Sequence, residues 1–80
     1  MKHQVTEREV SQCFCNKSGG LLEDDREDHL TTPRTEWFIS ETNRGRLLKV
    51  CFVWMGNNVD IKTAYEPSEE EQRIYDSMAY

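Results

Sequence analysis

Residues 36–65 read EWFISETNRGRLLKVCFVWMGNNVDIKTAY and contain three apolar runs separated by two short turns. The first run begins at Trp37 and is rich in large side chains that favour strands. The run at 47–54 is interrupted only by Lys49, which predicts a central strand covered on both faces. Residues 59–63 alternate between apolar and polar side chains, as in a strand with one face in water. The pattern predicts a three-stranded antiparallel meander.

The same helix-start signal, a Ser or Thr followed three residues later by Glu, occurs on each side of this meander. Thr6 and Glu9 begin a first helix, which is predicted to end near Asn16. Ser68 and Glu71 begin a second. The apolar stripes that we expect to face the core are Val10, Cys13 and Phe14 in the first helix, and Ile74, Tyr75 and Met78 in the second.

A short further strand is predicted at residues 21–22, ahead of an acidic run at residues 23–28 that we expect to form an exposed loop or edge. The fold class is therefore α+β, with a small antiparallel sheet flanked by an N-terminal and a C-terminal helix. A chain of 80 residues is one small domain, residues 1–80. No apolar run approaches the roughly 20 residues of a membrane span, so we expect no membrane partner.

Three cysteines, Cys13, Cys15 and Cys51, are an odd number without the spacing of a disulfide framework. This indicates reduced thiols in a cytoplasmic protein. A metal site that adds His29 is the alternative, but a Cys-x-Cys pair on a helix points its sulfurs about 200° apart, which suits chelation poorly. A nucleophilic cysteine is a further alternative, without a local motif to support it. We therefore expect no metal and no cofactor.

Charge is distributed unevenly along the chain. The net charge of −5 argues against an ordinary nucleic-acid-binding protein. However, residues 1–33 carry −3, residues 34–64 carry +2 and residues 65–80 carry −4. This basic middle predicts a local cationic site on the central sheet, suited to a phosphate or to an acidic partner. A solvated surface without such a site is the alternative.

Five stretches carry a family resemblance that covers almost the whole chain. They are KHQVTEREV at 2–10, EDDREDH at 23–29, WFI at 37–39, ETNRGRLLKV at 41–50 and KTAYEP at 62–67. They resemble a family of short bacterial proteins that often carry the label "ADP-ribosyl-(dinitrogen reductase) hydrolase". That family is similar in turn to BrnT-type toxins, which share the RelE-like α+β fold and cleave RNA in toxin–antitoxin pairs.

The resemblance implies a cytoplasmic, toxin-like domain that is a metal-independent ribonuclease or a degenerate derivative of one. The implied partners are RNA and a cognate antitoxin encoded nearby. Relatives have a further strand and the start of a helix before Lys2 and His3, so either the natural chain starts earlier or this domain lacks an edge strand. BrnT-like proteins also have a basic C-terminal half, whereas this chain has an acidic helix there, which weakens phosphate contacts.

Two other functions remain open. One is a non-catalytic protein-interaction module, which would bind protein through its acidic ends and an exposed sheet edge. The other is the hydrolase of the family label. Authentic ADP-ribosyl-protein hydrolases resemble large helical proteins with a dimetal carboxylate site, and this chain is too short for such a core.

Metal-independent RNA cleavage needs a base for the 2′-hydroxyl, cations for the phosphate and an acid for the leaving oxygen. His29 would act as base or acid, the arginines would hold phosphate and Trp37 would stack on a base. Each candidate also has a structural alternative. His29 would be a surface histidine, Arg26 would form an ordinary ion pair and Trp37 would belong to the core. Tyr65 and Glu66 would simply mark the end of a strand. The candidate catalytic residues are His29, Arg26, Arg46, Tyr65 and Glu66, and the candidate substrate-binding residues are Trp37, Arg44 and Lys49.

Overall fold

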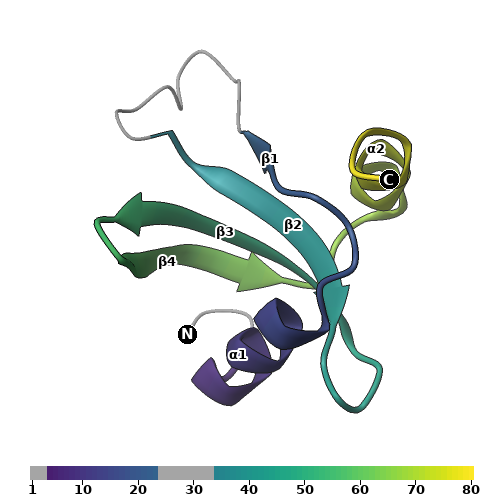
Figure 1. Ribbon diagram of the computed structural model, residues 1–80. Helices are drawn as coiled ribbons and strands as arrows, with labels where there is room; N and C mark the ends of the chain where they lie inside the picture. The colour runs from purple at the N-terminus through teal and green to yellow at the C-terminus, as the bar shows by residue number, and fades with distance from the viewer. Residues whose placement is uncertain (1–3, 24–33) are drawn as a thin grey trace.

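The computed structural model describes residues 4–23 and 34–80. Its four strands form one antiparallel sheet in the order β1-β2-β3-β4, and a helix lies at each end of the chain (Figure 1). The predicted α+β fold, with a three-stranded meander and a short additional strand, is confirmed, while its likeness to RelE stays a prediction. The elements are α1 Glu7–Asn16, β1 Leu22–Glu23, β2 Glu36–Glu41, β3 Leu47–Met55, β4 Asn58–Tyr65 and α2 Glu69–Met78.

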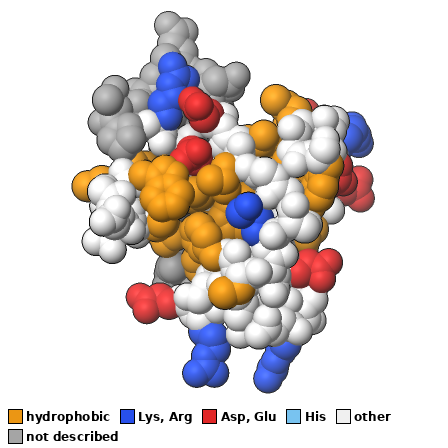
Figure 2. Space-filling view, in the orientation of Figure 1, with side chains coloured by type: hydrophobic (Ala, Val, Ile, Leu, Met, Phe, Trp, Pro, Cys, Tyr) orange, Lys and Arg blue, Asp and Glu red, His pale blue; other side chains and the backbone are white. Residues whose placement is uncertain are grey.

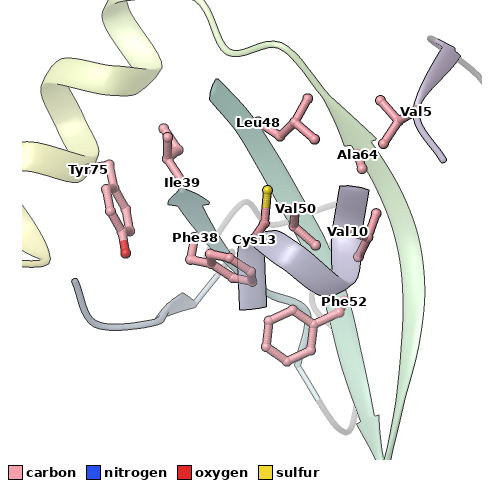
Figure 3. Packing of buried hydrophobic residues seen from close by; sticks show 10 residues of the cluster. All are labelled: Val5, Val10, Cys13, Phe38, Ile39, Leu48, Val50, Phe52, Ala64 and Tyr75. Atoms are coloured by element: carbon pink, nitrogen blue, oxygen red, sulfur yellow. The ribbon is translucent and has the colours of Figure 1, made fainter. Parts of the chain in front are cut away.

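One face of the sheet is covered by α1. The predicted capping box begins this helix: the Thr6 hydroxyl accepts from the backbone N–H of Glu9 at 3.1 Å, and the Glu9 carboxylate accepts from the Thr6 N–H at 3.0 Å. Cys13 is fully buried, and the Phe14 ring lies 4.7 Å from the Phe38 ring in an edge-to-face contact. Figure 3 shows Cys13 among the buried side chains of the sheet. The face of the sheet toward α1 contributes Phe38, Leu48, Val50, Phe52 and Ala64 to the buried cluster.

The opposite face of the sheet is partly covered by α2. Alternate residues of each strand point to this face, because neighbouring side chains in a strand point to opposite sides. Tyr75 is 1% exposed, and its ring centroid lies 5.6 Å from that of Trp37. The Tyr75 hydroxyl donates to the Gly20 carbonyl at 2.7 Å, and the Gly20 N–H donates to the Ala79 carbonyl at 2.9 Å. A Cβ atom on Gly19 would lie 2.7 Å from the Tyr75 hydroxyl, so this close approach requires glycine. These contacts hold the segment before β1 against α2.

The predicted apolar stripe of α2 is wrong at two of its three positions. Tyr75 is buried, but Ile74 is 42% exposed and Met78 is 66% exposed. Only a narrow side of α2 contacts the sheet, so the sheet does not cover the full width of the helix's apolar stripe.

Coverage of β3 also differs from the prediction. Its buried residues alternate with half-buried ones along the first part of the strand, so only the face toward α1 is fully covered. At the far end of β3, Trp54 is 44% exposed and Met55 is 56% exposed. The strand is interior to the sheet, as predicted, but it extends beyond the helices that flank it. Within the described ranges, no helix is both long and apolar enough to cross a bilayer.

We predict that Tyr75→Phe lowers the free energy of unfolding by about 1 kcal/mol, because the carbonyl of Gly20 loses its donor. Urea denaturation measures the change. Met78→Ala in the same helix is the control, and it should change the value by less than about 0.5 kcal/mol because its side chain is exposed. Equal losses in the two variants would contradict this assignment of the buried side of α2.

Candidate functional site

Three of the candidate residues, each from a different strand, lie on the sheet face that α2 flanks. Lys49 of β3 is directly opposite Tyr65 of β4, and Trp37 of β2 is opposite Cys51, two residues along from Lys49. The ammonium of Lys49 lies 4.3 Å from the centroid of the Trp37 ring and 5.8 Å from that of the Tyr65 ring. The two rings therefore offer cation–π contacts to one ammonium group.

Glu71, which the sequence predicted only as the capping residue of the second helix, completes this cluster. Its Oε2 atom accepts from the Lys49 Nζ at 2.8 Å and from the Tyr65 hydroxyl at 2.6 Å. Its Oε1 atom accepts from the backbone N–H of Ser68 at 2.9 Å, which closes the predicted capping box of α2. The Lys49 side chain is only 13% exposed and that of Glu71 is 25% exposed. One carboxylate therefore caps a helix and neutralises the central lysine.

In this cluster the pKa of each titratable group, Glu71, Lys49 and Tyr65, is shifted from its ordinary value to one further from neutral pH. Burial would raise the pKa of Glu71, but hydrogen bonds from Lys49, Ser68 and Tyr65 outweigh it and lower the pKa to about 2. Burial would lower the pKa of Lys49, but the bond to Glu71 outweighs it, so this pKa is raised. Burial raises the pKa of Tyr65, as does its bond to Glu71. None of the three groups is poised to exchange a proton near neutral pH, as general acid–base catalysis requires.

Arg46 and Glu66, both candidate catalytic residues, lie together in a second charged cluster next to α1. A terminal nitrogen of Arg46 lies 3.1 Å from a Glu9 carboxylate oxygen, and its Nε lies 3.5 Å from Glu66. The same guanidinium donates to the Gln4 carbonyl at 3.2 Å. The backbone of Thr6 and then Arg46 lower the pKa of Glu9. Arg46 thus joins the start of α1 to the start of β3 and to the segment that follows β4.

The cationic candidates are therefore divided between the two helices, with Lys49 bound to a carboxylate of α2 and Arg46 to one of α1. Arg44 lies exposed in the turn between β2 and β3, and the described residues give its side chain no ion-pair partner. Arg26 and His29 lie outside the described residues. The structure thus brings together Trp37, Lys49 and Tyr65, and separately Arg46 and Glu66.

The cysteines form no disulfide with one another. Cys13 is buried, and burial followed by the charge of Glu9 raises its pKa to about 11, so it stays a protonated thiol. Cys15 is exposed and Cys51 is half-buried. Residues 4–23 and 34–80 contain no group of three or more His, Cys, Asp or Glu side chains that could hold a metal ion.

An apolar groove of about 650 Å³ runs between α1 and β4. Val10 and Phe14 line it from the helix, and Val59 and Ile61 line it from the strand. The exposed Trp54 is the cross-strand neighbour of Val59, so its ring lies on the same face as the groove. We call this surface the α1–β4 groove. Hydrophobic side chains also reach the surface over the middle of the sheet in Figure 2, with most charged groups toward the margins.

Comparison of the chain with protein-family models, with curated proteins and with solved structures finds no match. Function is therefore inferred from the geometry of the residues themselves and from the motifs of the sequence.

Glu71 is predicted to make the stability of the fold sensitive to acid. Its folded pKa of about 2 lies below the ordinary value of 4.5, so the charged carboxylate stabilises the fold. This contribution is complete above about pH 5 and disappears as the pH falls toward about 2. Glu71→Gln should lower the free energy of unfolding by about 1–2 kcal/mol at neutral pH and flatten its decline in acid.

Urea denaturation at a series of pH values measures both effects. Glu69→Gln is the matched control, since it neutralises an exposed glutamate in the same helical turn. A decline in acid that is as steep in Glu71→Gln as in the unmodified chain would show that Glu71 does not carry this dependence.

Proposed function

We propose that this chain is a non-catalytic protein-binding domain, a degenerate derivative of the BrnT/RelE type of toxin that its motifs resemble. Its partner is a small protein of the antitoxin kind, encoded nearby. The observation that carries the proposal is the closed cluster of Lys49, Tyr65 and Glu71. In a ribonuclease, the lysine and tyrosine of this cluster would have to meet phosphate or a reacting hydroxyl instead of a carboxylate.

Acid–base chemistry has little support in this cluster. RNA cleavage at neutral pH is fastest when the acid and the base have pKa values near the working pH. The pKa of Glu71 is about 2, and the pKa values of Lys49 and Tyr65 are both raised. A carboxylate with so low a pKa is a weak base, and a lysine or tyrosine with a raised pKa is a weak acid.

Electrostatics favours protein over RNA as the partner. Phosphate contacts supply most of the affinity of a protein for RNA. They require Lys or Arg side chains that are not held in ion pairs with carboxylates of the protein itself. Lys49 and Arg46 are each within hydrogen-bond distance of a carboxylate of this chain. The net charge of −5 adds a general repulsion of the RNA backbone.

The α1–β4 groove supplies a surface for a protein partner. Large exposed apolar patches on small domains mark interaction sites, and Trp54 near the end of β3 extends this one beyond the groove. The ring of Trp54 lies 5.5 Å from that of Phe52, and Phe52 lies 5.3 Å from Phe14, so a row of aromatic contacts continues from the core to the surface. Such rigid aromatic side chains are typical anchors of protein interfaces.

The proposal predicts that the purified chain neither cleaves nor binds RNA. A labelled single-stranded oligonucleotide should stay intact, and its fluorescence anisotropy should not rise at low salt. Expression of the chain should not arrest growth. Salt-sensitive RNA binding that Lys49→Ala and Arg46→Ala both abolish, or growth arrest that they relieve, would contradict the proposal and favour the ribonuclease.

Binding of the protein partner is predicted to depend on Trp54. The product of the reading frame next to the gene should form a complex with the chain, measured by isothermal titration calorimetry. Trp54→Ala should weaken that complex at least about tenfold, because buried tryptophans dominate interface energies. Met78→Ala removes an exposed apolar side chain on α2, remote in sequence from the groove, and should leave the affinity within about twofold.

A further inference from the structure

The α1–β4 groove exists because α1 covers only part of its face of the sheet. The helix packs on β2 and β3, and one side of it is tied to the turn between those strands. The Asn16 amide donates to the Glu41 carbonyl at 2.9 Å. The Gln12 side chain accepts from the Asn43 N–H, also at 2.9 Å. The apolar residues of β4 on this face are therefore left only half-buried.

The uncovered strip has the dimensions of a second helix. On α1, the residues that line the groove are three or four positions apart, on one side of the helix: Glu7, Val10, Ser11 and Phe14. They extend over about 10 Å, or about two helical turns, because a helix rises about 1.5 Å per residue. Packed helices lie about 8–10 Å apart and strands about 4.8 Å apart. A helix beside α1 would therefore lie over β4 and its outer edge.

An extended peptide fits this place less well than a helix. β4 is the last strand in the order of the sheet, so an added strand would have to pair with its outer edge. A β-bulge interrupts the strand there: Cys51 is opposite Thr63, but the next residue of β3, Phe52, is opposite Ile61. Lys62 therefore has no cross-strand neighbour. Bulges and lysines are features that keep edge strands from pairing with other chains.

The charge of the groove defines the polar side of its occupant. Of the described residues that line it, Glu7 alone is charged. Glu7 is exposed, and no cation in residues 4–23 and 34–80 pairs with it. On β4, Lys62 and Asp60 neutralise each other, with Nζ and Oδ2 2.9 Å apart. A cationic side chain on an incoming helix therefore gains a partner in Glu7, whereas a carboxylate is repelled.

The inference rests on the protein-binding function proposed above and concerns the same groove. We propose that its occupant is a basic amphipathic helix of the partner protein, lying beside α1. The apolar side of that helix contacts Phe14, Val59 and Ile61, and the exposed Trp54 ring extends the contact at the end of β3. A Lys or Arg at its flank pairs with Glu7. Apolar anchors at every third or fourth residue are typical of helices that bind in grooves.

Labelled synthetic peptides of about 15 residues test the proposal, by fluorescence anisotropy with the full chain in about 0.15 M salt. The first peptide has Leu at every third or fourth position and Lys at most others. The second has Glu in place of each Lys, and the third is the basic peptide with a central Pro, which disrupts a helix. The basic peptide should bind saturably, and at least about tenfold more tightly than either of the others.

Two pairs of variants locate the bound peptide. Ile61→Ala should weaken binding of the basic peptide at least about fivefold, whereas Ile74→Ala, at an exposed position of α2, should change it less than about twofold. Glu7→Lys should lower the preference for the basic over the acidic peptide at least about threefold. Asp76→Lys changes the net charge equally on α2, outside the groove lining, and should leave that preference within about 1.5-fold.

The proposal is overturned if the basic peptide does not bind, if the Pro-containing or the acidic peptide binds as tightly, or if the two variants of each pair behave alike. Failure of the proposed function is a separate outcome, because no peptide derives from the product of the neighbouring reading frame. If that product binds through Trp54 but the basic peptide does not bind, the domain binds protein and the helical occupant is wrong. If the peptide binds and the product does not, the groove holds a helix and the assigned partner is wrong.

Discussion

The carboxylate of Glu71 is the contact on which the C-terminal half of the structure depends. It occupies the third position of α2, where its side chain closes the capping box with Ser68. The same carboxylate accepts from Lys49 and Tyr65, so it attaches the start of α2 to β3 and β4. The helix needs this attachment because it buries only one of its own residues, Tyr75. A helix with so little apolar contact is held largely by directed polar bonds.

Much of the fold follows from local patterns in the chain. Both capping boxes, the meander and the buried stripe of α1 were predicted because each depends on residues close in sequence. The exposure of Ile74 and Met78 could not be predicted in the same way. Periodicity shows which side of a helix is apolar, but how much of that side meets a sheet depends on distant contacts. The same limit applies to Trp54, which belongs to an apolar run that continues beyond the helices.

The candidate site was predictable in part, through strand register. Trp37, Lys49 and Tyr65 meet because three antiparallel strands place them on one face. Glu71 was assigned only its capping role, although a lysine within an apolar strand signals a missing counter-charge. The counter-charge lies in the acidic first turn of α2, which contains three adjacent glutamates. Which of the three contacts Lys49 could not be predicted without knowing how the helix packs on the sheet. Arg46 and Glu66 were proposed as catalytic, and their shared ion pair joins elements far apart in sequence.

The view of the domain as a binding module depends on whether Lys49 is truly engaged by Glu71. A cation that is loosely held can turn to a phosphate, whereas one that is strongly coupled to its carboxylate stays with it. The direct measurement is a double-mutant cycle on the free energy of unfolding, with Lys49→Met, Glu71→Gln and the double variant, at neutral pH. The account predicts a coupling energy above about 1 kcal/mol, more than an exposed ion pair supplies. A coupling near zero would show that the lysine is available to a ligand and would contradict the account.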